Sequence, residues 1–205
     1  MTMSESPVFV FVPGAWHATD TFDVVRDLMH KRGLATEAIS TPSVGAFPPD
    51  KGLHADIEHT HAVLKEMVEA GRQVVVVNHS YGGMVGAGAV EGLGYSQRCK
   101  VGLPGGVIMV VWMAAFVTPK GKSKSFHEPA TYEPWHDMPS MYLFCNKDGG
   151  IPLAGQEIFA QTLGNPVTYH VDASHSAFLS MPEKVIDGLE IALKEGRQQS
   201  GIAVN

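Results

Sequence analysis

Cysteine is scarce in this 205-residue chain. Its two copies, Cys99 and Cys145, are too few for a disulfide framework, and they lack the spacing of metal-ligand pairs. We therefore expect no disulfide scaffold and no metal site. At 44% hydrophobic residues the composition is close to the globular norm, which excludes a disordered chain.

Charge is also sparse, because only 18% of the residues are charged against a usual share of about 25%. The 15 basic residues are outnumbered by 21 acidic ones, which gives a net charge of −6. Recognition of nucleic acid or of anionic lipid depends on concentrated Lys and Arg. Neither is therefore an expected partner.

Long apolar runs are missing as well. The longest, residues 107–117, is about half of the ~20 residues that span a bilayer. The first six residues lack the positive region and apolar run of a secretory signal. We therefore expect a cytoplasmic protein without a membrane segment.

Five short apolar runs rich in β-branched and aromatic residues predict strands. Because the runs are unbroken rather than alternating, they indicate strands covered on both faces, as in a parallel sheet. The predicted strands are Val8–Val12, Val74–Val77, Val107–Trp112, Met141–Cys145 and Val167–Val171.

The segments between these runs have helical periodicity. For the last helix we expect a capping box of Ser180 and Glu183, Pro182 in the first turn and an end at Gly196. The predicted core faces are Leu53, Ile57, Leu64, Met67 and Val68 within 52–70; Phe22, Val25, Leu28 and Met29 after Thr21; and Val185, Leu189, Ala192 and Leu193 in the last helix. This alternation predicts one α/β domain over residues 1–205, with a mostly parallel sheet and helices on both faces.

Residues 118–139 interrupt the alternation with a polar, proline-rich stretch. Its three lysines, Lys120, Lys122 and Lys124, are interpreted as part of a solvated loop. A long irregular segment after a strand often lies over the ligand crevice of an open α/β sheet. We expect this loop to lie over an active site.

The sharpest chemical motif is VVVVNHSYGG at 74–83, where a buried strand meets Ser80 and a helix of small residues. One interpretation is a strand-to-helix turn that exposes a serine nucleophile. The turn brings the helix close to the strand, and a side chain at position 82 would clash there, which explains Gly82. Asn78 departs from this pattern, since a glycine is usual two residues before the serine. The alternative reading makes Ser80 a helix N-cap.

Two further segments could complete a catalytic site. His175 follows the last predicted strand, where it can reach a serine exposed on the same edge of the sheet. Asp148 follows the penultimate strand and could orient the imidazole, although Asp148-Gly149-Gly150 is also an ordinary turn sequence. Asp137 and Asp172 are the alternative acids.

Five motifs in order resemble the α/β-hydrolase superfamily, and in particular the plant-type methylesterases, the hydroxynitrile lyases and their microbial relatives. They are VPGAWH at 12–17, TPSVG at 41–45, VVVVNHSYGG at 74–83, YLFCNKDGGIP at 142–152 and DASHSAFLSMPEKV at 172–185. The resemblance covers nearly the whole chain and implies the α/β-hydrolase fold.

The resemblance also implies roles for individual residues. Ser80, His175 and Asp148 would form a catalytic triad, and the backbone N–H groups of Ala15 and Tyr81 would form an oxyanion hole. Gly14, Trp16, His17, Trp135 and Phe178 would contact the substrate. No cofactor is implied.

One departure from the family concerns the cap between the predicted strands at 107–112 and 141–145. Members usually carry a helical cap there, whereas residues 118–139 leave room for a short loop only. The large apolar side chains left to wall the pocket are Phe126, Tyr132 and Trp135. A shallow pocket, a cover supplied by a second subunit in a homodimer, or a bulky substrate would each account for this.

The expected function is serine hydrolysis of a small-molecule ester or lactone. A first alternative is a non-hydrolytic enzyme with the same residues, which cleaves carbon–carbon bonds, eliminates, decarboxylates or cyclises. Cyanohydrin cleavage is disfavoured, since that branch resembles one with a lysine after the histidine, where this chain has Ser176. A second alternative is a catalytically silent ligand-binding relative.

Overall fold

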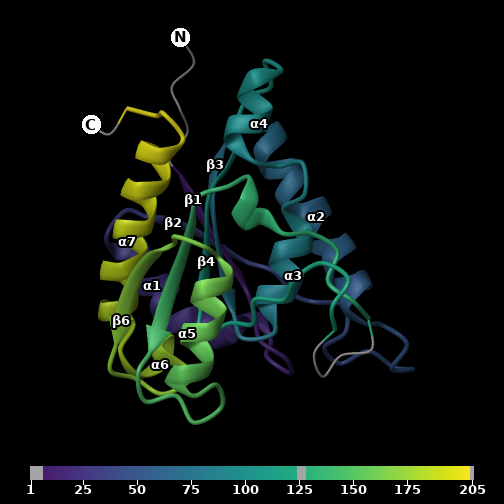
Figure 1. Cartoon of the computed structure of the whole chain (residues 1–205), viewed down its shortest axis with the longest axis vertical. Helices are drawn as coiled ribbons and strands as arrows, with labels where there is room; N and C mark the ends of the chain where they lie inside the picture. The colour runs from purple at the N-terminus through teal and green to yellow at the C-terminus, as the bar shows by residue number, and fades with distance from the viewer. Residues whose placement is uncertain (1–6, 124–127, 204–205) are drawn as a thin grey trace.

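A six-stranded parallel sheet forms the centre of the molecule (Figure 1). The computed structural model describes residues 7–123 and 128–203. Neighbouring strands are parallel throughout, in the order β2-β1-β3-β4-β5-β6. The strands are β1 (Val8–Val12), β2 (Ala35–Ala38), β3 (Gln73–His79), β4 (Gly106–Met113), β5 (Ser140–Cys145) and β6 (Val167–Val171). The predicted parallel sheet is confirmed.

The sequence patterns missed β2. This strand has four residues, of which only Thr36 is buried, because β2 lies at the edge of the sheet and pairs only with β1. A short edge strand lacks the unbroken apolar run that revealed β1, β3, β4 and β5. The other edge strand, β6, was predicted from its β-branched and aromatic residues, but its alternating burial shows that it is not covered on both faces as expected. Those five lie where they were predicted, with β3, β4 and β5 slightly longer.

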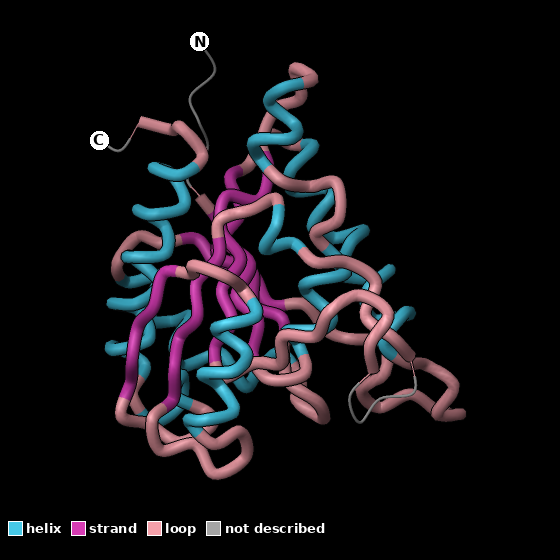
Figure 2. Tube along the Cα trace, viewed as in Figure 1, coloured by secondary structure: helices cyan, strands magenta, loops and turns pink. Residues whose placement is uncertain are grey.

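Helices cover both faces of the sheet, as predicted (Figure 2). One face carries α2 (Leu53–Glu69), α3 (Gly82–Ala89) and α5 (Leu153–Thr162), and the other carries α1 (Asp23–Lys31), α6 (Ala177–Ser180) and α7 (Pro182–Gln199). The shorter elements are α4 (Tyr95–Lys100) and the 3-10 turns η1 (Thr19–Phe22) and η2 (Pro134–His136). Each face of the sheet therefore has its own apolar core, and together these cores fix the strands rigidly.

The ends of α7 differ from the prediction in two ways. Its first turn has no side-chain cap, because Ser180 belongs to α6 and Met181 stands at the N-cap position. The predicted capping box is therefore wrong. The helix also continues past Gly196 to Gln199, because Gly196 is a packing glycine: a Cβ there would lie 2.8 Å from the carbonyl oxygen of Ile108.

The segment 118–139 crosses the face formed by α2 and α3 (Figure 1). Glu128 Oε2 accepts a hydrogen bond of 3.1 Å from the backbone N–H of His54, in the first turn of α2. Trp135 packs against the buried Trp112, with ring centroids 6.2 Å apart. Phe126 lies outside the described residues. The second half of this segment is thus held against the body of the protein at Glu128 and at Trp135.

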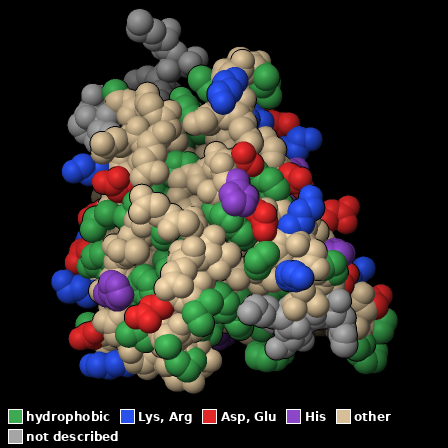
Figure 3. Space-filling view, viewed as in Figure 1, with side chains coloured by type: hydrophobic (Ala, Val, Ile, Leu, Met, Phe, Trp, Pro, Cys, Tyr) green, Lys and Arg blue, Asp and Glu red, His purple; other side chains and the backbone are tan. Residues whose placement is uncertain are grey.

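The surface agrees with the composition. On the face shown in Figure 3, basic side chains lie among acidic ones rather than in a single field. Across residues 7–123 and 128–203, no helix combines the length and the apolar character that crossing a membrane requires.

Candidate active site

The carboxyl ends of four strands bring the candidate residues to one edge of the sheet. Gly14 and Ala15 follow β1, Ser80 follows β3, Asp148 follows β5, and His175 follows β6. Because the strands are parallel, these ends meet at a single edge, where open α/β sheets bind their ligands.

Ser80 lies on a sharp turn between β3 and α3. Its φ of +53° is in the left-handed region, which a residue with a side chain rarely adopts. The Ser80 carbonyl accepts hydrogen bonds of 3.0 Å from the N–H groups of Gly83 and Phe116. A Cβ on Gly82 would lie 2.7 Å from the carbonyl oxygen of Pro13, so the missing side chain lets the turn press against the end of β1. This is the packing that the sequence predicted for Gly82.

Asn78 is accommodated by Gly86, one turn into α3. A Cβ on Gly86 would overlap the side-chain amide of Asn78, with 2.6 Å to its Cγ. Asn78 is fully buried, and its amide has no hydrogen-bond partner among the described residues. The larger residue at this position therefore depends on the small residues of α3 and leaves the turn at Ser80 intact.

His175 is paired with Asp148. The His175 Nδ1 and the Asp148 Oδ2 are 2.6 Å apart, and the carboxyl side chain has no exposed surface. Its other oxygen, Oδ1, accepts hydrogen bonds from the N–H groups of Gly150 (2.7 Å) and Ile151 (2.9 Å). Asp148 is thus held in the orientation that directs Oδ2 at the imidazole.

The alternative acids have other partners. Asp137 accepts a hydrogen bond of 2.5 Å from the hydroxyl of Tyr132, and Asp172 accepts one of 2.6 Å from the side-chain amide of Asn146. Of the three aspartates considered from the sequence, Asp148 is the one that the structure brings to His175.

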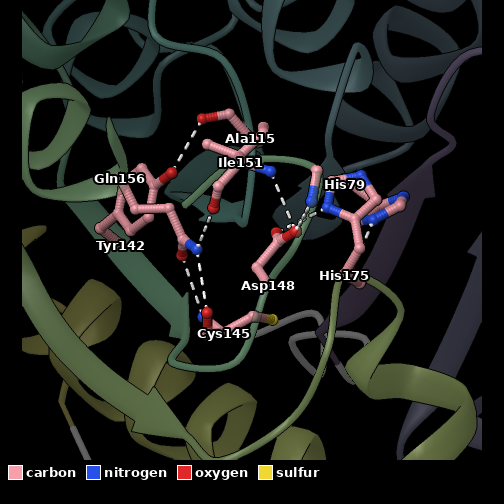
Figure 4. A network of polar contacts seen from close by, with 9 residues as sticks. His79, Ala115, Tyr142, Cys145, Asp148, Ile151, Gln156 and His175 are labelled. Atoms are coloured by element: carbon pink, nitrogen blue, oxygen red, sulfur yellow. Dashed lines mark hydrogen bonds and ion pairs between the residues drawn. The ribbon is translucent and has the colours of Figure 1, made fainter. Parts of the chain in front are cut away.

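Gln156 clamps the loop that carries Asp148 (Figure 4). Its side-chain amide, on α5, donates to the carbonyl oxygens of Cys145 and Ile151 and accepts from the N–H of Cys145, all within 2.9 Å. Gln156 is completely buried. Sequence reasoning missed it, since a glutamine within a helix gives no sign of the loop that it meets.

His79, directly before Ser80, contacts both the backbone and the ring of His175. Its Nε2 donates a hydrogen bond of 3.0 Å to the carbonyl oxygen of His175, and the two ring centroids are 4.6 Å apart. Burial, with the charge on His175 as a smaller cause, lowers the pKa of His79 to about 3. His79 is therefore neutral at physiological pH, and its place in the site was not predicted.

The residues expected to contact substrate separate into two groups. Trp16 lies beside the candidate cavity with 92% of its side chain exposed, and its φ of +64° is again left-handed. Gly14 and His17 are not among the residues that line the cavity, and Gly14 lies against Ser80: a Cβ on Gly14 would be 3.1 Å from the Cβ of Ser80 and 3.2 Å from the His17 Nδ1. Phe178 is fully buried against His79, so its position is in the core beneath the site.

A cavity of about 600 Å³ is lined by Ala15 and by Tyr81, the residue that follows Ser80. Eight of its twelve lining residues belong to one segment, residues 43–53, which we call the cavity loop. Glu128 is the one lining residue from segment 118–139 among those that the structure describes. The full lining is Ala15, Trp16, Ser43, Val44, Gly45, Pro49, Asp50, Lys51, Gly52, Leu53, Tyr81 and Glu128.

A buried carboxylate joins the cavity loop to the turn at Ser80. Asp56, on α2, has no exposed surface and accepts hydrogen bonds from the Tyr81 hydroxyl (2.8 Å), the Ser43 hydroxyl (2.6 Å) and the Ser43 N–H (2.8 Å). Burial and the bond to Asp56 raise the pKa of Tyr81 well above its ordinary value, so its hydroxyl stays protonated. The sequence contains no signal that connects these three segments.

Comparison with known proteins gives consistent matches. The model of the Alpha/beta hydrolase family matches residues 9–121, more than half of the chain. The "Alpha/beta hydrolase nvfD" of Aspergillus novofumigatus is 25% identical, over 88% of this chain and 94% of that protein.

Within the part that the structure describes, no three His, Cys, Asp or Glu side chains gather as a metal site requires.

Two solved structures share the fold at low sequence identity. A pyrethroid hydrolase from Sphingobium faniae JZ-2 superposes with a TM-score of 0.69, at 16% identity over 90% of this chain and 96% of the other. The methylesterase protein MES16 from Arabidopsis gives a TM-score of 0.70, at 17% identity over 92% and 99% of the two chains.

Proposed function

Since the chain belongs to the alpha/beta hydrolase family, we propose that it is a serine hydrolase of small-molecule esters or lactones, with Ser80 as its nucleophile. The observation that carries the proposal is the 2.6 Å pair of His175 and the buried Asp148, at the same sheet edge as the left-handed turn at Ser80. A serine on a strained turn, an imidazole and a carboxylate are the parts of an acyl-transfer site.

In the proposed first step, the Ser80 hydroxyl attacks the acyl carbon and its proton passes to the Nε2 of His175. Asp148 holds the Nδ1–H and stabilises the imidazolium that forms. The backbone N–H groups of Ala15 and Tyr81 donate to the oxyanion, each worth about 10²–10³ in rate. His175 then gives the proton to the leaving oxygen, and an acyl-serine remains.

In the second step, His175 takes a proton from water, which attacks the acyl-serine and releases the acid product. Ser80 regains its proton from His175, so the cycle closes without a metal or an organic cofactor. His79 supports this exchange because it is neutral and adds no positive charge beside the imidazolium.

The cavity suggests which part of the chain selects the substrate. Its wall combines apolar side chains such as Val44, Pro49 and Leu53 with the charged Asp50, Lys51 and Glu128. We propose that the cavity loop, rather than the shortened segment 118–139, provides most of the substrate contacts. One protein of similar fold is named a methylesterase and another a hydrolase, which agrees with hydrolysis of an ester substrate.

The test is a panel of small esters and lactones incubated with the protein in ¹⁸O-water. We expect the acid product to carry ¹⁸O, and Ser80→Ala to lose this activity at least ~10³-fold. Ser96→Ala, on α4 away from the site, is the matched control and keeps full activity. Turnover without ¹⁸O in the product would favour the non-hydrolytic alternative, and equal activity of Ser80→Ala would exclude Ser80.

A further inference from the structure

We propose that Asp56 is a positioning residue that fixes the oxyanion-hole residue Tyr81 and the cavity loop in one arrangement. The proposal rests on the function proposed above, since it assigns a task to Tyr81 in that reaction. Asp56 does not line the cavity but is bonded to Tyr81 and Ser43, which do, so its effect passes through these two residues.

The first observation is that both oxygens of a buried carboxylate accept hydrogen bonds. Among the described residues, Asp56 accepts three hydrogen bonds of 2.6–2.8 Å, which come from two residues that line the cavity, Ser43 and Tyr81. Bonds of this kind to an ionised acceptor are short and directional. Burying a carboxylate costs free energy that its hydrogen bonds only offset, so net stability is a weak reason for its presence. Its distinct effect is to fix geometry.

The second observation is the place of Tyr81 in the chain. Tyr81 directly follows Ser80 and precedes α3, so its ring and its backbone N–H belong to the same short turn. Only 5% of Tyr81 is exposed, and the bond from its hydroxyl to Asp56 ties the ring to α2. An oxyanion donor must lie 2.7–3.1 Å from the developing charge, and a displacement of about 1 Å can cost ~10²-fold in rate.

The third observation is the link to the cavity loop. Ser43 begins this loop, and both its hydroxyl and its N–H are bound to Asp56. The same carboxylate therefore sets the start of the wall that faces substrate and the residue that stabilises the oxyanion. Through Asp56, binding a substrate against the loop is coupled to the alignment of Tyr81.

The test uses Asp56→Asn, which keeps the size of the side chain but replaces one acceptor oxygen by an NH₂ that opposes the donors. We expect kcat to fall about 10- to 100-fold, with KM changed less than about threefold, on an ester that the wild type hydrolyses. Tyr81→Phe removes the same bond from the other side and should give a similar loss. Ser43→Ala should act mainly on KM, raising it several-fold.

Two comparisons separate positioning from a merely structural role. If Asp56 acts through Tyr81, the Asp56→Asn/Tyr81→Phe double variant loses no more kcat than the worse single variant. Asp27→Asn, an exposed aspartate on α1, is the matched control and keeps wild-type kcat. Folding is checked by thermal melting, and assays run well below the lowest melting temperature.

The outcomes are distinct. Wild-type kcat in a folded Asp56→Asn, or additive losses in the double variant, would overturn the Asp56 proposal. The serine mechanism would stand in either case if a fluorophosphonate still labels Ser80 of the wild type. Absence of that labelling would overturn both proposals together.

Discussion

The Nε2 of His79 donates a 3.0 Å hydrogen bond to the backbone carbonyl of His175. His79 directly precedes Ser80, the proposed nucleophile, and it thus holds the backbone of His175, the proposed general base. This bond joins the last residue of β3 to the loop after β6, and the two histidines lie 96 positions apart in the sequence. The bond requires a proton on Nε2, and because burial lowers the pKa of His79 to about 3, the ring is neutral with its one proton on that nitrogen at physiological pH. The site is therefore linked to pH through a residue that takes no part in the proposed chemistry.

Because His79 is buried and neutral, we predict that the folded protein loses stability as the pH falls. The unfolded chain binds a proton at His79 near pH 6.5, whereas the folded protein does so only near pH 3. Between these values the unfolded state holds more protons, so the free energy of unfolding falls as pH falls, by up to about 1.4 kcal/mol per pH unit. Above pH 6.5 this contribution is constant.

The measurement is urea unfolding between pH 4.5 and 7.5. His79→Gln removes the titrating group, so its stability should change less with pH than that of the wild type. His59→Gln, at an exposed position on α2, should keep the wild-type slope. Parallel slopes for the wild type and His79→Gln would contradict the assignment.

Asp148→Asn should disable the site while leaving the fold intact. The substitution keeps the shape of the side chain but lets an NH₂ group oppose either His175 or the N–H groups of Gly150 and Ile151. We expect a fall in kcat of about 10³–10⁴-fold, as when the acid of a serine triad is neutralised. Steady-state kinetics with circular dichroism as the folding control tests this, and a loss under tenfold would argue against Asp148 as the acid.

Gly82→Ala should destabilise the protein, because its new Cβ would lie 2.7 Å from the Pro13 carbonyl oxygen and closer still to that of Val12. Backbone oxygens cannot yield easily, so we expect a loss of about 1–3 kcal/mol. Gly155→Ala, on α5, is the contrast: its nearest atom would be 3.7 Å away, and alanine favours a helix by up to about 1 kcal/mol. Chemical denaturation of both variants should give shifts of opposite sign, and equal shifts would contradict the packing described here.

The two cysteines should differ in reactivity. Cys99 is exposed, while Cys145 is fully buried and burial raises its pKa to about 12. A thiol reagent at pH 8 should therefore modify one thiol quickly in the native protein and two in the denatured protein. Cys99→Ser should abolish the fast reaction. Rapid modification of both thiols in the native wild type would mean that the loop after β5 opens readily.

Much of the fold follows from local sequence. Unbroken apolar runs such as Val8–Val12 give the buried parallel strands, because only strands covered on both faces can be apolar throughout. The turn at Ser80 is also readable, since its small residues are needed where the chain passes close to Pro13. Edge strand β2 and the continuation of α7 past Gly196 were missed because each is set by a neighbour distant in sequence.

The same reason explains which site residues were found. Ser80, Asp148 and His175 each follow a strand, so the order of the strands already places them at one edge. Gln156, His79 and Asp56 act through side-chain contacts with loops that are far away in the sequence or have no pattern of their own. The cavity loop was likewise overlooked in favour of segment 118–139, because only the folded chain shows which loop faces the turn at Ser80.

The most direct test of the central claim is mass spectrometry of the protein after reaction with a fluorophosphonate. The serine mechanism predicts a single adduct, located on Ser80 by peptide mapping, with none on Ser80→Ala and a much slower reaction of Asp148→Asn. An unreactive wild type, or the same adduct on Ser80→Ala, would contradict it.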